Sequence, residues 1–218
     1  LAIEHKIFLI IDEVYEDFVW GQTHNSIYSQ LNDIEKNELD RLVLLQRAIT
    51  KTWQRPNARA GYLKGPRDFI AWAEGEILHG VSNTHAVAIS DQARILAALA
   101  LQDSVKSSYL STMKGIIGAN REKVHGWARQ NGRNLILPYT DKLPPGAPLV
   151  CWNVEGVCKK HGYPDSELLV RELELHYGLK LIAGKSSGAP FLVRVAVGQD
   201  EFRIDQAIEI MNSFIDRA

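Results

Sequence analysis

The sequence predicts an α/β protein in which a part built on a parallel sheet is followed, from about residue 111, by a smaller α+β part. Two short apolar runs, 6–12 and 41–45, predict strands, and the first, which is rich in β-branched residues, is typical of a strand buried on both faces of a parallel sheet. A long helical segment over 104–130 then leads to a stretch in which short strands and amphipathic helices alternate. With 218 residues, 45% of them apolar, the chain can bury a sizeable core.

The first part, residues 1–110, should contain three strands and two helices. The expected elements are strands at Lys6–Asp12, Arg41–Leu45 and Gly61–Gly65 and helices at 66–73 and 85–100. Pro66 suits the start of a helix, because a proline in the first turn removes no hydrogen bond that the helix needs. The polar stretch Gly21–Asp40 has few periodic apolar positions.

The second part, residues 111–218, should be α+β. The expected elements are a helix over Ser104–Gln130 that bridges the two domains, strands at Leu149–Val154, Leu179–Ile182 and Phe191–Val197, and helices that begin after Asp165 and Asp200. An aspartate before a helix accepts hydrogen bonds from the first backbone N–H groups, so both residues predict helix starts. Gly178 predicts the end of the first of these helices, and Asn131-Gly132 the end of the long one.

Composition and charge exclude several classes of function. The formal charge is −1, from 25 basic and 26 acidic residues, which gives no reason to expect a nucleic-acid or membrane partner. The longest apolar stretch, Ile7–Ile11, is far shorter than the roughly 20 residues of a membrane helix, and no signal peptide is visible. Cys151 and Cys158 lack the spacing of a disulfide framework or a zinc site. A cytoplasmic protein without a metal is therefore expected.

Asp12 and Tyr15 follow the first predicted strand. Ligand sites in open α/β sheets lie outside the carboxyl ends of the strands, so Asp12 is a candidate binding residue. The alternative is an aspartate that accepts a backbone hydrogen bond in the following turn. Tyr15 taken alone would more often be a packing residue.

Lys51 follows the second predicted strand among uncharged neighbours. An amine held away from water loses its proton more readily and becomes nucleophilic toward an aldehyde. The alternative is a surface lysine whose stem packs on the protein. Arg59 comes eight residues later and could bind a phosphate or carboxylate through two hydrogen bonds, or form a surface ion pair.

Arg194 interrupts the apolar run Phe191–Val197. A guanidinium inside a strand either lies on the solvated face of an antiparallel sheet or points into a cleft toward an anionic ligand. Both placements stay open from the sequence.

Taken together, these residues resemble the fold-type I pyridoxal-phosphate enzymes of the aspartate aminotransferase superfamily, class I and II. The resemblance lies in Asp12-Glu-Val-Tyr15, then a lysine about forty residues later, then Arg59-Ala-Gly61-Tyr62, and an arginine in a late strand. The segment from Arg47 to Tyr62 looks most like the branch that contains histidinol-phosphate aminotransferase and threonine-phosphate decarboxylase. The resemblance implies a partial three-layer large domain over 1–110 and a small C-terminal domain over 111–218.

The resemblance also implies a cofactor, pyridoxal 5′-phosphate, and a role for each matched residue. Lys51 would form the Schiff base, Asp12 would keep the pyridine nitrogen protonated, Tyr15 would hydrogen-bond the phenolic oxygen, Arg59 would bind the phosphate with help from Thr50, and Arg194 would bind the substrate carboxylate. The implied reaction is amino-group transfer between an amino acid and a 2-oxo acid or phosphorylated ketone, by a protein that is a homodimer when full length.

The sequence departs from the family pattern at several points. Ala48 stands where the family has a small hydroxyl residue, and Asn57 stands where it has a glycine. The family's first half has no counterpart here, and the chain opens on Leu1 instead of methionine, so we expect the C-terminal part of a longer protein. The alternatives that these residues leave open are a decarboxylase, lyase or cyclase with the same cofactor, and a non-catalytic relative.

Overall fold

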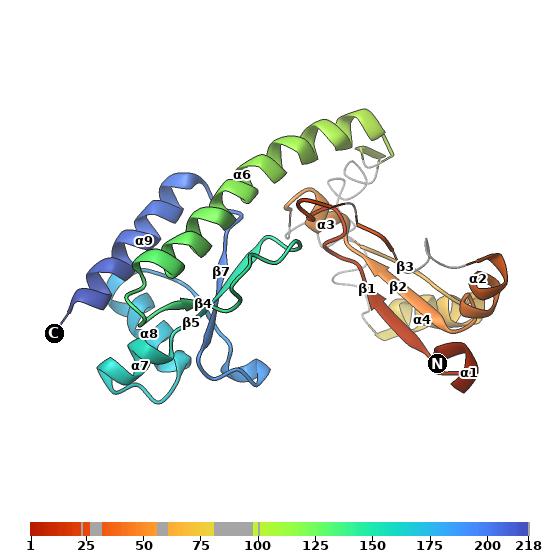
Figure 1. Ribbon diagram of the computed structural model, residues 1–218. Helices are drawn as coiled ribbons and strands as arrows, with labels where there is room; N and C mark the ends of the chain where they lie inside the picture. The colour runs from red at the N-terminus through yellow and green to blue at the C-terminus, as the bar shows by residue number, and fades with distance from the viewer. Residues whose placement is uncertain (23, 27–31, 56–60, 81–97, 100, 218) are drawn as a thin grey trace. The chain divides into compact units, whose positions relative to one another are not determined.

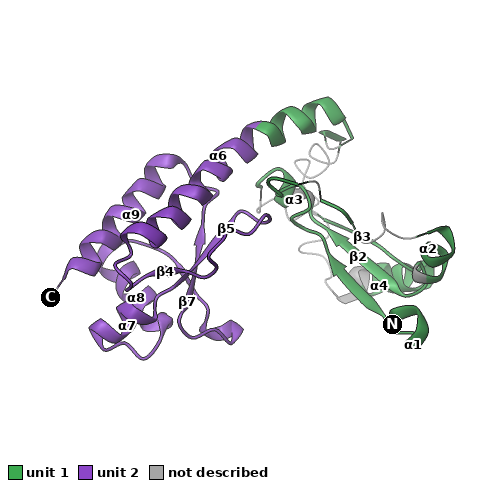
Figure 2. Cartoon of the chain, in the orientation of Figure 1, with its two compact units in different colours: residues 1–111 green, residues 112–218 purple. Residues whose placement is uncertain are grey.

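The chain forms two compact units, each with its own sheet. The computed structural model describes residues 1–22, 24–26, 32–55, 61–80, 98–99 and 101–217 (Figure 1). The units are Leu1–Ser111 and Thr112–Ala218 (Figure 2). The first holds a three-stranded sheet in the order β1-β2-β3, and the second a four-stranded sheet in the order β4-β5-β7-β6. The α/β class predicted from the sequence is confirmed; all but residues 98 and 99 of the helix expected over 85–100 lie outside the described residues.

The first unit contains the three strands that the sequence predicts. Its elements are α1 (Ala2–His5), β1 (Leu9–Asp12), α2 (Asp33–Leu39), β2 (Val43–Arg47), α3 (Ile49–Thr52), β3 (Tyr62–Lys64) and α4 (Arg67–Gly80). β1 and β2 are parallel, with Leu9 opposite Val43 and Asp12 opposite Gln46. β3 runs antiparallel to β2. The carboxyl ends of β1 and β2 therefore meet at the edge where β3 begins.

Burial distinguishes the two parallel strands. Val43, Leu44 and Leu45 of β2 are buried, since this strand lies between β1 and β3. The prediction that β1 is buried on both faces is wrong, because its residue Ile10 is 68% exposed. In the described part of the chain β1 pairs with β2 alone and forms an edge of the sheet.

Helix α2 was not expected from the polar stretch that contains it. Its first turn is closed by a capping box: Asn32 Oδ1 accepts from the Glu35 backbone N–H at 2.9 Å, and Glu35 Oε2 accepts from the Asn32 N–H at 3.0 Å. Asn-x-x-Glu is a sequence signal for a helix start. The signal was present in the sequence, and periodicity alone missed it.

The second unit is α+β, as predicted. Its elements are α6 (Asp103–Asn131, which begins in the first unit), β4 (Leu137–Pro138), β5 (Leu149–Asn153), α7 (Glu155–His161), α8 (Ser166–Tyr177), β6 (Ile182–Ala183), the 3₁₀ turn η3 (Lys185–Ser187), β7 (Leu192–Ala196) and α9 (Glu201–Asp216). Every strand pair in this sheet is antiparallel. β4, α7 and η3 are additions to the predicted elements, and the strand expected at Leu179–Ile182 forms only at Ile182–Ala183.

Local capping fixes the helices of the second unit where the sequence predicts them. Asp165 Oδ1 accepts from the Glu167 backbone N–H at 2.9 Å, which starts α8, and Gly178 ends that helix in the left-handed region at φ 68°. Asp200 Oδ1 accepts from the Arg203 N–H at 2.9 Å and starts α9. These bonds satisfy backbone groups that a helix leaves free at its ends.

The core of the second unit lies between its sheet and its helices. Its fully or almost fully buried side chains include Ile117, Trp152, Leu169, Leu173, Val193, Met211 and Phe214. The ring centres of Trp127 and Trp152 are 5.0 Å apart, which joins α6 to β5. The sheet therefore packs through its buried face, and its other face carries the exposed alternate residues of β7.

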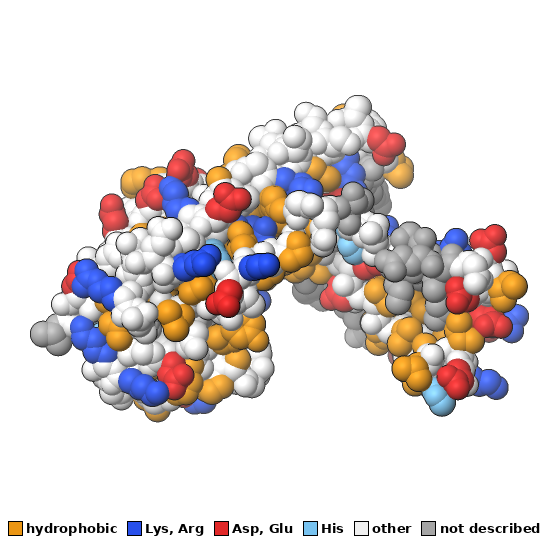
Figure 3. Space-filling view, in the orientation of Figure 1, with side chains coloured by type: hydrophobic (Ala, Val, Ile, Leu, Met, Phe, Trp, Pro, Cys, Tyr) orange, Lys and Arg blue, Asp and Glu red, His pale blue; other side chains and the backbone are white. Residues whose placement is uncertain are grey.

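The surface shows no region dominated by one sign of charge on the face in Figure 3, where acidic, basic and apolar side chains are interspersed. Among the described helices, none combines the length and the apolar character that crossing a membrane requires.

Two leucines of α8 provide a matched test of this packing. Leu173 is 0% exposed and Leu175 is 65% exposed. Leu173→Ala should lower the free energy of unfolding by about 2–5 kcal/mol, because it removes buried methyl groups and leaves a cavity. Leu175→Ala should change it by less than about 0.5 kcal/mol. Urea unfolding of the two variants measures both values, and equal losses would contradict the described core.

Candidate functional site

A pocket of about 800 Å³ opens in the first unit where the parallel strands end. Its lining comes from the ends of the three strands, from α3 and from one face of α4: Asp12, Val14, Tyr15, Gln46, Arg47, Ala48, Lys51, Gly61, Tyr62, Leu63, Ile70, Ala73 and Glu74. This edge of an α/β sheet is where ligand sites form. Asp12, Tyr15 and Lys51, which the sequence singles out, all line this one pocket.

Asp12 takes part in the turn and also lines the pocket. Its Oδ1 accepts from the Val14 backbone N–H at 3.1 Å, which is the turn contact that the alternative interpretation predicts. The residue is exposed, and it stands beside Gln46 in the register of the two strands. The turn bond orients a carboxylate that remains accessible from the pocket.

Lys51 lies in the short helix α3 and is half-buried. Its Nζ is 5.5 Å from the centre of the Tyr15 ring, within range of a cation–π interaction. Among the described residues, no carboxylate lies within ion-pair distance of this amine. The side chain of Thr50 and the whole of Arg59 lie outside the described residues.

Arg194 belongs to β7 in the second unit, whereas the pocket lies in the first. It is exposed and alternates with the buried residues Val193 and Val195. The register places it opposite Cys151 and Ile182. Its side chain is thus on the exposed face of the antiparallel sheet, and its role in binding a substrate stays a prediction.

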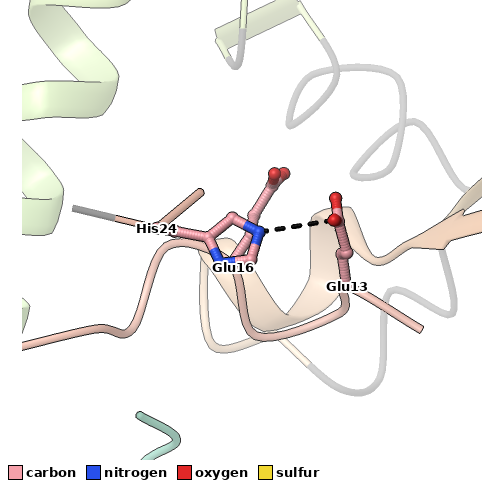
Figure 4. Close-up of side chains that lie close together, drawn as sticks. All are labelled: Glu13, Glu16 and His24. Atoms are coloured by element: carbon pink, nitrogen blue, oxygen red, sulfur yellow. Dashed lines mark ion pairs between the residues drawn. The ribbon is translucent and has the colours of Figure 1, made fainter. Parts of the chain in front are cut away.

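An ion-pair network that the sequence did not reveal lies beside the pocket. Arg47 Nη2 is 2.9 Å from Glu13 Oε2 and 3.0 Å from Glu16 Oε2, and Arg47 Nη1 donates to the Tyr62 hydroxyl at 3.5 Å. His24 Nε2 lies 3.5 Å from Glu13 Oε1 (Figure 4). One guanidinium therefore joins the segment after β1 to the ends of β2 and β3.

Burial and charge shift the pKa values of this network in opposite directions. Burial tends to raise the pKa of Glu13, but hydrogen bonds from Ser26 and Arg47 and the charge of Arg47 outweigh it and lower the pKa. Burial raises the pKa of Glu16. Glu13, Glu16 and His24 have the ligand types of a metal site, but Arg47 already supplies positive charge to both carboxylates, so we assign no metal to them.

A second set of contacts anchors the chain just after Lys51. Thr52 Oγ1 donates to Asp17 Oδ2 at 2.6 Å, and Lys106 Nζ of α6 is 2.9 Å from Asp17 Oδ1. The rings of Trp53 and Tyr109 lie 4.7 Å apart, and the Tyr109 hydroxyl donates to the Trp53 carbonyl at 2.9 Å. The residues on both sides of Lys51 are thus held by the segment that follows Asp12.

Gly61 provides a test of the close backbone approach at the pocket. A Cβ on Gly61 would lie 2.8 Å from the Arg47 carbonyl oxygen. Gly61→Ala should destabilise the fold by about 1–3 kcal/mol, because backbone has to move to accept the methyl group. In Gly75→Ala the new Cβ meets no described atom within 4 Å, and alanine favours a helix by about 1 kcal/mol. Urea unfolding should therefore show a lower unfolding free energy for Gly61→Ala and a higher one for Gly75→Ala. Equal changes in the two variants would contradict the close approach.

Glu13 should make stability depend on pH. A carboxylate whose pKa is lowered in the folded state stabilises the protein above its unfolded pKa, about 4.3, and loses this contribution as the pH falls through the folded pKa. The difference in unfolding free energy between wild type and Glu13→Gln should be largest near neutral pH and shrink below about pH 4. Urea unfolding from pH 7 to pH 3 measures it. A difference that does not vary with pH would contradict the pairing of Glu13 with Arg47.

Comparison with known proteins identifies relatives over the whole chain. The model of the family "Aminotransferase class I and II" matches residues 1–210. Aspartate aminotransferase of Bacillus subtilis (strain 168) is 22% identical over 218 residues, which cover 100% of this chain and 51% of that protein. The chain thus spans about half the length of the curated relatives that it matches.

Solved structures share the fold. A mutant of Thermus thermophilus aspartate aminotransferase superposes with a TM-score of 0.76 at 18% identity, covering 98% of this chain and 50% of that one. A PLP-bound protein of Clostridium difficile 630, described as an aminotransferase, gives a TM-score of 0.72 at 16% identity over 99% and 51% of the two chains. Because the family model covers almost every residue, the chain belongs to the class I and II aminotransferases, a family of pyridoxal-phosphate enzymes.

Proposed function

We propose that the natural protein is a pyridoxal-phosphate-dependent aminotransferase in which Lys51 holds the cofactor. The observation that carries the proposal is that Asp12, Tyr15 and Lys51 line one pocket in a member of this family. The substrates would be an amino acid and a 2-oxo acid or phosphorylated ketone. The name of the B. subtilis relative, aspartate aminotransferase, supports this substrate class.

The side chains of the pocket fit the functional groups of the cofactor. Pyridoxal phosphate presents an aldehyde, a ring nitrogen and a phenolic oxygen, and the pocket offers the Lys51 amine, the Asp12 carboxylate and the Tyr15 hydroxyl. Among the described residues that line the pocket, the arginine is Arg47, but Glu13 and Glu16 already pair with its guanidinium. We therefore assign the phosphate to Arg59 and Thr50, as the family resemblance implies.

The reaction would use this chain's residues as binding and proton-transfer groups. When bound, the cofactor supplies an electron sink for negative charge at the substrate α carbon. Lys51 Nζ would take the proton from that carbon and deliver it to the carbon of the cofactor's former aldehyde group, which is general acid–base catalysis. The Asp12 carboxylate would hold a proton on the ring nitrogen, since a nearby negative charge favours the cationic form. Arg194 would bind the substrate carboxylate by two hydrogen bonds.

The domain division and the partners belong to the same proposal. Residues 1–110 would form the C-terminal part of the large, cofactor-binding domain and residues 111–218 the small domain, which the separate contact clusters of the two units support. The homodimer, the cytoplasmic location and the absence of nucleic-acid and membrane partners stay predictions from the sequence. So does the branch with histidinol-phosphate aminotransferase, which rests on the segment from Arg47 to Tyr62; the relative reported above is an aspartate aminotransferase.

Removal of the Lys51 amine should abolish the covalent attachment of the cofactor. Borohydride reduction of the natural full-length protein with pyridoxal phosphate should leave a pyridoxyl group on Lys51, detected by mass spectrometry. Lys51→Arg keeps the charge but has no primary amine, so it should not be labelled, and amino transfer should fall by at least about a hundredfold. Lys36→Arg, in the exposed ion pair of α2 with Asp33, is the matched control and should behave as wild type.

The same protein distinguishes the competing functions. Transfer of an amino group to a 2-oxo acid without release of carbon dioxide supports the aminotransferase. Release of carbon dioxide without dependence on an oxo acid would instead indicate a decarboxylase that uses the same Lys51 and Asp12. Failure to bind the cofactor at saturating concentration would indicate a non-catalytic relative and contradict the proposal.

A further inference from the structure

The lysine-bearing segment is anchored on its N-terminal side by Arg47. This residue ends β2, four positions before Lys51, and its guanidinium contacts Glu13 at 2.9 Å and Glu16 at 3.0 Å. The Glu13 side chain is only 5% exposed, so its charge needs a partner. Removing Arg47 would leave the buried Glu13 charge without this partner, which makes the position of Arg47 relative to Glu13 strongly determined.

The same segment is anchored on its C-terminal side by Thr52. Its hydroxyl donates to Asp17 at 2.6 Å, and the residue is itself buried. Lys106 of α6 contacts the other oxygen of Asp17 at 2.9 Å, so the carboxylate is held in place from a second element. A hydrogen bond to a charged acceptor is shorter and stronger than one between neutral groups.

Between these anchors the chain has little stability of its own. Helix α3 has four residues, Ile49–Thr52, and a single turn of helix is marginal in water without tertiary contacts. Its position, and with it the position of the Lys51 amine over the Tyr15 ring, must come from the contacts at its two ends. Both ends contact the run Glu13–Asp17, which directly follows Asp12.

We propose that the run Glu13–Asp17 acts as a two-point clamp that positions Lys51 relative to Asp12. Its first contact is with Arg47 through Glu13 and Glu16, and its second is with Thr52 through Asp17. The clamp residues do not react; they are positioning residues that act through the lysine. The inference rests on the proposed function, since it assigns Lys51 as the residue that takes the cofactor.

The test measures how fast and how rigidly Lys51 takes up pyridoxal phosphate in the natural full-length protein. Thr52→Val removes the hydroxyl donor at constant shape, and Thr52→Ser restores a hydroxyl; Glu13→Gln removes a charge and keeps Arg47 paired with Glu16. Arg47→Met is avoided because it would leave two acidic side chains unpaired. Three quantities are followed: borohydride-trapped pyridoxyl-Lys51 against time, visible circular dichroism per attached cofactor, and the urea unfolding midpoint.

Thr52→Val and Glu13→Gln should each take up the cofactor about tenfold more slowly, the change expected for loss of a hydrogen bond to a charged group. Their visible circular dichroism per attached cofactor should fall, because the lysine no longer holds it in one orientation. Thr52→Ser should recover most of both signals. Lys123→Met, which breaks two ion pairs with exposed carboxylates, Glu201 and Asp205, in the second unit, should leave both unchanged.

Wild-type uptake and wild-type circular dichroism in Thr52→Val and Glu13→Gln, with only the unfolding midpoint lowered, would overturn the clamp and leave the proposed function intact. Slow uptake in Lys123→Met would also overturn it, because the effect would then be a general one. If wild-type protein gave no pyridoxyl-Lys51, the proposed function would fail first and the clamp with it.

Discussion

The buried carboxylate of Glu13 is the constraint on which the arrangement of the pocket depends. A charge with so little exposure requires a cation beside it, and the guanidinium of Arg47 meets that requirement at 2.9 Å. Glu13 directly follows Asp12, the last residue of β1, and Arg47 ends β2. The contact between Glu13 and Arg47 therefore fixes the carboxyl ends of the two parallel strands next to each other. The pocket opens at these strand ends, so its shape depends on an ion pair whose arginine also lines it.

Much of the fold follows from short-range signals in the sequence. The starts of α8 and α9 were predictable because an aspartate side chain bonds the backbone of its own next turn, a contact that needs no other part of the chain. Helix α2 carried an equally local signal in Asn32 and Glu35. Helix α7 begins at Glu155, whose backbone N–H donates to Asn153 Oδ1 at 2.9 Å, a local signal that periodicity missed. The two-residue strand β4 exists only through its pairing with β5, so it could not be predicted locally.

Part of the candidate site could likewise be predicted from the sequence, and part depends on the folded chain. Asp12, Tyr15 and Lys51 could be selected from residue type and from their position after predicted strands, and all three line the pocket. The clamp could not be found in this way, because Asp17 is 35 residues from Thr52 and 89 from Lys106, and its partners are defined only by the folded chain. Nothing in the sequence distinguishes Glu13 and Arg47 from other charged residues, because their contact depends on the register of β1 and β2.

The contrast between reactive and supporting groups also has a physical reason. Arg47, Glu13 and Asp17 have their charges matched by close partners, which lowers their freedom to move and to react. The Lys51 amine lies 5.5 Å from the centre of the Tyr15 ring and, within the described chain, has no carboxylate at ion-pair distance, so no salt bridge holds its nitrogen. Rigidity and reactivity thus come from different residues of the same two segments. The charged contacts at the two ends of α3 position the lysine, while no described carboxylate pairs with its amine.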